Sequence, residues 1–324
     1  MQATTPQKLA AMALAAAAAA AALALAAGSP AGALAAGPPP PQAQTHNAQS
    51  VSYASATLNG SVNPRGSDTS YYFQYGPTRG YGGQSAIGDA GAGTSLVKVS
   101  QPVGGLQPLT LYHYRLVAVS AGGVTMGGDR TFLTTKVPLS LQILASPNPV
   151  SYGASATVQG TLSGTGNAGQ QVVLQANSFP FTAGFQNLGN PQVTSATGGF
   201  SFPVLALTGA TQFRVSTTSN PPVLSPVVQE GVQVRVESHL ARARRRHARF
   251  FGTVTPAENG MQVAILRIVH GRGVLVGGTV LRPRNATSSR FSRVVPVKPG
   301  VYRVLVRVTS GAQSSNYGRP LAIR

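Results

Sequence analysis

The sequence predicts an all-β protein in which three sandwiches follow one another along the chain. First, its 324 residues suffice for two or three domains. Second, charged residues are only 10% of the chain and Gly occurs 38 times, which suits short strands joined by turns better than helices. Third, no segment after the N-terminus keeps a 3.6-residue apolar period, and the last two thirds contain a repeat.

The N-terminal region predicts export. Residues 1–36 are interpreted as a signal peptide, because Lys8 precedes nineteen uncharged, alanine-rich residues and small-x-small cleavage sites follow. The alternative is an uncleaved anchor, since the length nearly spans a bilayer, and a membrane is expected as a partner only through it. Residues 37–47 are expected to be a Pro-rich, disordered linker. We therefore expect a secreted or cell-surface protein, and the alanine and arginine usage suggests a bacterial one.

The first sandwich is predicted over residues 48–136. In the run YHYRLVAVS, Tyr112, Tyr114, Leu116 and Ala118 alternate with residues of the opposite face, which is typical of a half-buried strand. The Asn59-Gly60 pair, in contrast, indicates a turn.

The stretch before that strand points to a family. Leu106-x-Pro108-x-Thr110-x-Tyr112, followed by the alternating strand and FLTT, resembles the fibronectin type III domain. The resemblance implies that Tyr112 forms the tyrosine corner, in which its hydroxyl bonds the backbone a few residues upstream. The chain departs from the family in having no Trp, and we expect Tyr72 or Phe73 to fill that space.

The second and third sandwiches are predicted over residues 137–237 and 238–324 from an internal duplication. Three blocks match in order: Gly160–Gln175 with Gly252–Arg267, Phe200 with Phe291, and Phe213–Val215 with Tyr302–Val304. Each unit resembles the Ig-like domains of exported bacterial surface proteins. That resemblance supplies no ligand-binding residues.

The positive charge is concentrated in the third unit. The formal net charge is +19, of which residues 238–324 carry +15, residues 46–136 carry +3 and residues 137–237 carry none. Clustered guanidinium groups favour phosphates and carboxylates, so the third unit is a candidate polyanion-binding domain. The predicted binding residues are Arg242, Arg244, Arg245, Arg246, Arg249, Arg303 and Arg307. The alternative is a solvated edge whose charge only discourages aggregation.

Nothing in the sequence predicts catalysis, a metal site or a cofactor. The chain has six carboxylates and five histidines, no cysteine, no paired acids in a sugar-binding context and no nucleophile elbow. Asp68 and Asp129 lie beside turn residues, where an aspartate is expected to cap its own backbone.

The sequence thus predicts an exported, non-catalytic modular surface or cell-wall-associated protein. We expect it to space and bind, with the basic third domain on an anionic envelope polymer or polysaccharide and with no nucleic acid as partner. One alternative is a structural stalk or assembly protein whose charge is incidental. Another is a set of accessory modules of a polysaccharide-active enzyme.

Overall fold

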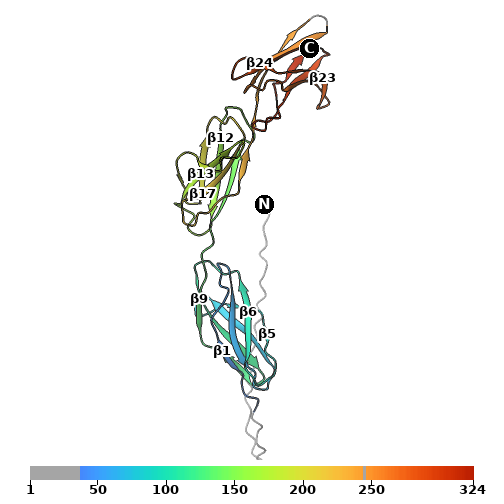
Figure 1. Ribbon diagram of the computed structural model, residues 1–324. Coiled ribbons are helices and arrows are strands. Elements are labelled where there is room, and N and C mark those ends of the chain that lie inside the picture. The colour runs from blue at the N-terminus through green and yellow to red at the C-terminus, as the bar shows by residue number, and fades with distance from the viewer. Residues whose placement is uncertain (1–36, 244–245) are drawn as a thin grey trace, which may run out of the picture.

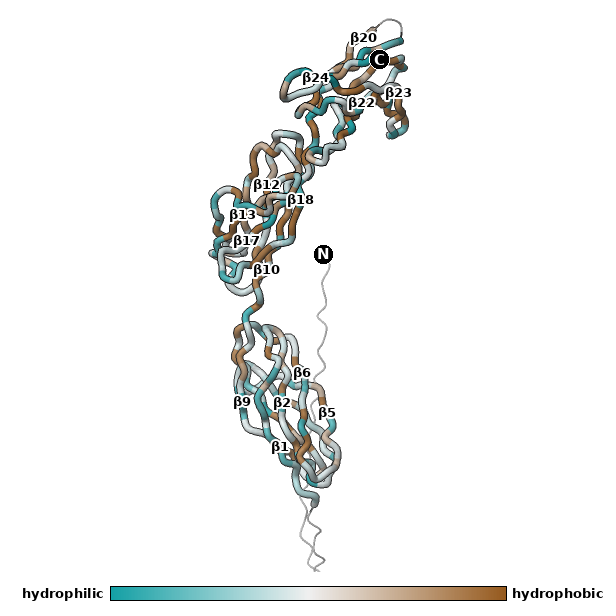
Figure 2. The backbone as a smooth tube through the Cα atoms, in the orientation of Figure 1, coloured by the Kyte–Doolittle hydropathy of each residue, from teal (hydrophilic) through white to brown (hydrophobic). Residues whose placement is uncertain are grey.

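The computed structural model describes residues 37–243 and 246–324, and every regular element in these ranges is a β-strand. Figure 1 shows three sandwiches placed end to end, so the predicted all-β tandem fold is confirmed. The predicted signal peptide, residues 1–36, lies outside the described residues. Within these ranges, no helix is long and apolar enough to cross a membrane. In Figure 2 teal and brown alternate at short intervals along the chain, as half-buried strands require.

The first sandwich packs a three-stranded sheet against a six-stranded one. Its strands are β1 (Gln42–Thr45), β2 (Ser55–Asn63), β3 (Thr69–Gly76), β4 (Gly83–Gln84), β5 (Gly88–Asp89), β6 (Val97–Gly104), β7 (Leu111–Ser120), β8 (Gly123–Met126) and β9 (Arg130–Leu133). One sheet has the order β1-β2-β6. The other has the order β4-β3-β7-β8, with β5 on β3 and β9 on β7.

The core of this sandwich agrees with the predicted alternation. Tyr112, Tyr114, Leu116 and Ala118 of β7 are all buried. Of the two residues expected to replace the absent Trp, Phe73 is fully buried among them and Tyr72 is half-buried.

The tyrosine corner implied by the family resemblance is present in the structure. The Gln107 N–H donates to the Tyr112 hydroxyl at 3.0 Å. Because Tyr112 is the second residue of the long strand β7, this bond fixes the chain where it enters the sheet.

The second sandwich has its own pair of sheets. Its strands are β10 (Ser140–Ser146), β11 (Val150–Ser151), β12 (Ala156–Ser163), β13 (Gln171–Ser178), β14 (Gln186–Asn187), β15 (Gln192–Val193), β16 (Gly199–Val204), β17 (Thr211–Thr217), β18 (Val228–Glu230) and β19 (Val232–Gln233). One sheet has the order β10-β12-β16, and the other has the order β14-β13-β17-β18 with β15 on β13. β11 pairs with β19 in parallel.

The third sandwich repeats this plan with one long hairpin added. Its strands are β20 (Arg235–Arg242), β21 (His247–Thr255), β22 (Gln262–Val269), β23 (Arg272–Val280), β24 (Arg282–Pro283), β25 (Ser289–Pro296), β26 (Gly300–Arg307), β27 (Asn316–Tyr317) and β28 (Leu321–Ile323). One sheet has the order β20-β21-β25-β24. The other has the order β23-β22-β26-β27, with β28 on β26.

The internal repeat is visible in the strand registers. In each copy the glycine block pairs with a phenylalanine strand, and the following strand pairs with the aromatic-Arg-Val strand. The partners are Gly160–Phe200 and Ala176–Phe213 in the second sandwich, and Gly252–Phe291 and Arg267–Tyr302 in the third. The Gly–Phe pairing therefore recurs at sequence-matched residues, whereas the second pairing is shifted by one residue, because Arg267 matches Gln175 and not Ala176. The two sandwiches share one strand plan.

A glycine in the second main strand of each sandwich is required by close packing. At Gly60 an added Cβ would lie 2.7 Å from Leu116 Cδ2 and 2.8 Å from the Gln44 carbonyl oxygen. At Gly160 and Gly252 it would overlap a neighbouring carbonyl oxygen in the same way. The prediction of a turn at Asn59-Gly60 was therefore wrong, because this glycine lies inside β2 and is there to let a neighbouring strand approach.

Two predicted boundaries differ from the structure. Residues 37–47 were assigned to a disordered linker, but Gln42–Thr45 form β1 and pair with β2. Polar, proline-flanked residues can hold an edge strand, because an edge needs backbone pairing on one side only. The third sandwich also begins slightly before residue 238, since Val234 lies in its core and β20 starts at Arg235.

The junction between the first and second sandwiches is a single residue. Thr135 N–H donates to the Ser52 carbonyl in the first sandwich, and Val137 N–H donates to Thr165 Oγ1 in the second. Lys136 stands between them, and among the described residues no hydrogen bond joins the part of the chain before it to the part after it.

The junction between the second and third sandwiches is hydrogen-bonded. Ala210 N–H donates to the Ala312 carbonyl at 2.7 Å, and Gln313 Nε2 donates to the Thr208 carbonyl at 2.7 Å. The connecting strand β19 bonds both sandwiches, since its Val232 pairs with β11 and accepts from the Ser314 N–H. The third sandwich is therefore held directly against the second.

Candidate anion-binding surface

The outer face of the sheet β20-β21-β25-β24 gathers basic side chains from several segments of the chain. Thr253 on β21 pairs with Arg290 on β25, and Arg290 pairs with Arg282 on β24. Arg249 is exposed on the same side of β21 as Thr253, two pairs of residues along the strand. The antiparallel registers thus bring Arg249 to the same face as arginines that lie 33 and 41 residues later in the chain.

These side chains line one open hollow of about 710 Å³. We call its five arginines the arginine face: Arg249, Arg282, Arg284, Arg290 and Arg293. His239 and one carboxylate, Glu237, line the same hollow. The Glu237 Oε2 atom accepts a hydrogen bond from Thr253 Oγ1 at 3.2 Å. Five guanidinium groups therefore share the surface with a single carboxylate.

The exposure of Arg293 on this face differs from what strand alternation predicts. It pairs with Phe250, whose ring is fully buried, so alternation alone would point Arg293 inward. It is nevertheless exposed and lines the same hollow as the other four arginines.

Like charges stand directly opposite each other on this face. Arg282 and Arg290 are cross-strand partners, and both are exposed. Directly opposed like charges destabilise a sheet. A bound anion between the two guanidinium groups would remove that repulsion, because each can donate two parallel hydrogen bonds to a phosphate, sulfate or carboxylate.

Arg249 is the most constrained member of the face. Its Nε donates to Ser292 Oγ at 2.9 Å, and its guanidinium lies 5.1 Å from the ring centroid of Phe251. Its Nη atoms, on the far side of the guanidinium, have no hydrogen-bond partner among the described residues.

The positive charge of the third sandwich has little internal compensation. Across residues 37–243 and 246–324 the salt bridges are Arg79–Asp129 and His113–Asp129, both in the first sandwich. Glu258 in the third sandwich is buried, and burial raises the pKa of its carboxyl group.

The structure divides the seven arginines predicted to bind a polyanion. Arg249 lies on the arginine face. Arg242 ends β20, Arg246 is exposed at the start of the returning strand, and Arg244 and Arg245 lie outside the described residues. Arg303 and Arg307 are on β26 in the opposite sheet, so they do not share a face with Arg249.

Arg303 has a structural role that the sequence analysis did not identify. Its guanidinium lies 4.5 Å from the ring centroid of Tyr317. Arg115 and Arg214 occupy the matching strand of the other two sandwiches and stack on Tyr81 and Phe185 in the same way. Because these two sandwiches carry little net charge, the shared stacking indicates an architectural contact rather than a ligand site.

Four residues of the arginine face, namely Arg282, Arg284, Arg290 and Arg293, were not among the predicted binding residues. Arg282 and Arg284 lie in the segment LRPRNATSSR, where an Arg-x-Arg pair precedes a third arginine. That spacing was the available signal, since alternate residues of a short strand point to the same side.

Titratable groups outside the arginine face make structural contacts. Among the described residues no three His, Asp or Glu side chains gather as metal ligands. Asp129 was expected to cap its own backbone, but it accepts instead from Tyr81 at 3.0 Å and lies 2.9 Å from His113 Nδ1. Burial acts to raise the pKa of Asp129, but the His113 and Tyr81 hydrogen bonds and the His113 and Arg79 charges outweigh it and lower that pKa.

No protein-family model matches the chain, and no curated protein matches it. Among solved structures it is similar to the chicken CNTN1 FN1–FN3 domains, with 14% identity, a TM-score of 0.30, and 88% of this chain and 96% of that chain covered. A tetra-tandem repeat from the extending region of a large adhesion protein gives 12% identity, a TM-score of 0.32, and 88% and 75% coverage. A marsupial T cell receptor gives 11% identity, a TM-score of 0.29, and coverage of 86% of this chain and 99% of that chain. The sheets described above define the Ig-like and fibronectin type III-like tandem fold.

Proposed function

We propose that this protein is an exported, non-catalytic modular spacer and binder at the bacterial surface or cell wall, and that its third sandwich contacts an anionic envelope polymer. The observation that carries the proposal is the arginine face, where five guanidinium groups lie over one sheet with a single carboxylate. Such a surface attracts a polyanion over a distance and then holds it by charge-assisted hydrogen bonds.

The arrangement of the sandwiches supports the spacing part of this function. The hydrogen-bonded second junction presents the third sandwich at the end of a two-sandwich unit. The one-residue first junction connects that unit to the first sandwich. Such a chain carries a binding face away from its N-terminal end.

The electrostatic part can be tested with heparin as the probe and the full chain as the protein. We expect affinity to fall steadily as salt rises from 50 to 500 mM, because ions screen the attraction and are released on binding. Affinity that is unchanged by salt would contradict the proposal.

The location of the site can be tested with two charge-matched double variants. Arg290→Ala with Arg293→Ala removes two members of the arginine face, whereas Arg272→Ala with Arg307→Ala removes two exposed charges from the opposite sheet. We expect the first pair to weaken heparin binding at least tenfold and the second less than threefold. Equal losses would mean that net charge acts without a defined face.

A structural stalk with incidental charge is the second candidate, and the hydrogen-bonded second junction is the observation that favours it. In that case the arginine-face double variant would lose heparin binding but keep its normal retention on the cell surface.

A further inference from the structure

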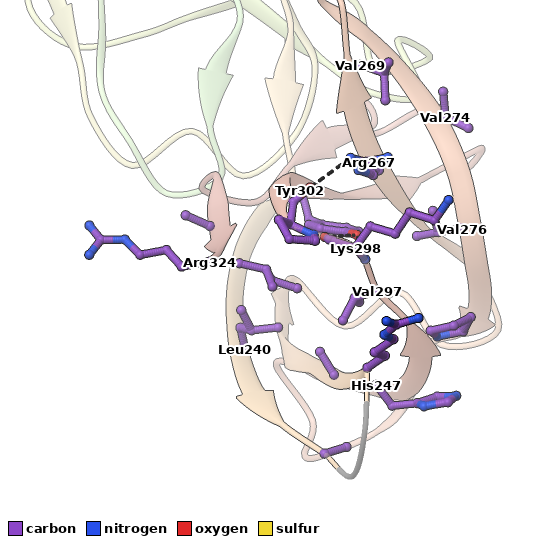
Figure 3. Close-up of a pocket in the computed structure, with 17 residues that line it drawn as sticks. Leu240, His247, Arg267, Val269, Val274, Val276, Val297, Lys298, Tyr302 and Arg324 are labelled. Atoms are coloured by element: carbon purple, nitrogen blue, oxygen red, sulfur yellow. Dashed lines mark hydrogen bonds between the residues drawn. The ribbon is translucent and has the colours of Figure 1, made fainter.

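The third sandwich is open at one end, between its two sheets. An apolar groove of about 1610 Å³ lies there, lined by residues from both sheets and from the loop before β26. Figure 3 shows Leu240 on one side of this groove and Val276 on the other, with Tyr302 between them. The Tyr302 ring is fully buried and forms the floor, fixed by hydrogen bonds to both the N–H and the carbonyl of Lys298.

One wall is a hairpin that has no counterpart in the second sandwich. β22 and β23 pair over their full length, out to Val269 and Arg272 at the tip. In the second sandwich the strand that follows β13 is β14, which is only two residues long. The long hairpin therefore extends past the core and leaves apolar side chains in solvent, with Val274 50% and Leu275 65% exposed.

Three valines of the hairpin line the groove, whereas the exposed Leu275 does not. Val269, Val274 and Val276 line it from the hairpin, and Val297 and Leu240 line it from the facing side. Exposed apolar surface of this kind in a soluble domain indicates a binding site. At about 1610 Å³ the groove exceeds the range of about 300–1,000 Å³ usual for small-molecule pockets, so it can take an extended chain.

The charged groups at the groove are cationic. Arg246, Arg267, Lys298 and Arg324 line it, and no Asp or Glu side chain among the described residues does. In Figure 3 Lys298 reaches across the groove toward Val276. Arg267 Nη2 donates to the Pro299 carbonyl at 2.8 Å, but its Nε is buried and has no hydrogen-bond partner. The Arg303 Nε is buried without a partner in the same way, so this atom alone does not indicate a ligand. The cationic lining as a whole favours an anionic head group.

We propose that this groove binds a single-chain anionic amphiphile, with the alkyl chain along the valines and the anionic head at Arg267 and Lys298. The net charge of +15 in the third sandwich opposes a second copy of the chain as the occupant. Because the floor lies between two walls, the ligand enters as a single molecule rather than as the surface of a bilayer. This site is separate from the arginine face and goes beyond the proposed function.

The probe is octyl phosphate, titrated calorimetrically into the full chain below its micelle-forming concentration. Inorganic phosphate and octyl glucoside supply the head alone and the chain alone. We expect octyl phosphate to bind at least tenfold more tightly than either, since only it uses both parts of the groove. Binding no tighter than that of inorganic phosphate would overturn the proposal. Binding seen only with anionic phospholipid vesicles would also overturn it, in favour of a membrane surface.

Two variants locate the binding. We expect Val274→Asp to weaken octyl phosphate binding at least tenfold and Lys298→Ala three- to tenfold. Val124→Asp, at an exposed strand valine of the first sandwich, is the matched control and should change nothing. Unchanged affinity in Val274→Asp would refute the groove as the site.

Heparin binding separates this proposal from the previous one. The Val274→Asp variant should keep normal heparin affinity, which also shows that the third sandwich is folded. The Arg290→Ala, Arg293→Ala double variant should keep normal octyl phosphate affinity. If the wild-type chain does not bind heparin, the proposed function is overturned and the groove proposal stands. If it does not bind octyl phosphate, the groove proposal is overturned and the proposed function stands.

Discussion

The substitution Glu230→Gln is expected to remove a pH dependence from the stability of the second sandwich. Glu230 ends β18, is fully buried, and neither of its carboxylate oxygens has a hydrogen-bond partner. Burial raises the pKa of this carboxyl group from 4.5 to about 7, and the nearby Val150 N–H, which is bonded to the Gly231 carbonyl, offsets only part of that effect.

The sign and size of the effect follow from this pKa. Between pH 4.5 and 7 the folded chain keeps a proton on Glu230 that the unfolded chain has released. The free energy of unfolding therefore falls as pH rises through this window, and it stays low above pH 7. A shift of about 2.5 pKa units corresponds to about 3 kcal/mol. Above pH 7 the folded protein must bury a charge without a partner, which is the physical origin of the loss.

Hydrogen exchange in urea, followed by mass spectrometry on peptides from β13 and β17 in the full chain, measures this free energy for the second sandwich. We expect wild type to lose about 3 kcal/mol between pH 4.5 and pH 8 and the Glu230→Gln variant to lose much less. The control is Glu237→Gln, at an exposed carboxylate of the third sandwich. A Glu230→Gln variant that keeps the wild-type slope would refute this account of the buried carboxyl.

Three further substitutions test the architecture, each by urea unfolding of the full chain. Tyr112→Phe should cost about 1 kcal/mol in the first sandwich, because the Gln107 N–H loses its acceptor; no loss would mean that water replaces the hydroxyl. Gly252→Ala should cost about 1–3 kcal/mol in the third, because the methyl group overlaps the backbone of β20; a neutral result would show that the strands separate freely. Arg303→Ala should cost about 0.5–1 kcal/mol, as expected for lost stacking, while Arg307→Ala stays near zero; equal effects would contradict the stacking role.

The fold was predictable because its signals are local or repeated. Alternating side chains in β7 depend only on the two-residue period of a strand, and the structure buries the residues that this period selects. The duplication needed no structural knowledge, since Phe200 and Phe291 already matched in sequence. Their pairing with Gly160 and Gly252 explains why those blocks match: the glycine leaves room for the aromatic ring of the neighbouring strand.

The errors in the fold came from residues whose local preference and tertiary role differ. Asn-Gly is a strong turn signal when nothing else constrains the chain. At Gly60 the constraint is the adjacent carbonyl of Gln44, which belongs to β1 and therefore to the segment predicted to be disordered. The two errors are linked, because the close contact that requires Gly60 is made by β1, and β1 was predicted to be disordered.

The binding site was predictable in its charge but not in its position. Net charge is a sum over residues, so the third unit could be identified as cationic from the sequence alone. A shared face depends on strand register and on which sheet each strand joins. Arg249 and Arg303 look equivalent in sequence, as exposed arginines of alternating strands, but they belong to opposite sheets. Arg282 and Arg290 look unremarkable, yet the register places them opposite each other.

The comparison among the three sandwiches separates arginines that hold the fold from arginines that are free to bind. A contact that recurs in sandwiches of very different charge, such as Arg115, Arg214 and Arg303 stacked on an aromatic ring, serves the strand plan they share. Features confined to the third sandwich, namely the opposed arginines on one sheet and the long hairpin over the groove, have no such common cause. Since opposed like charges and exposed valines both cost stability in the free protein, they indicate surfaces shaped for a partner.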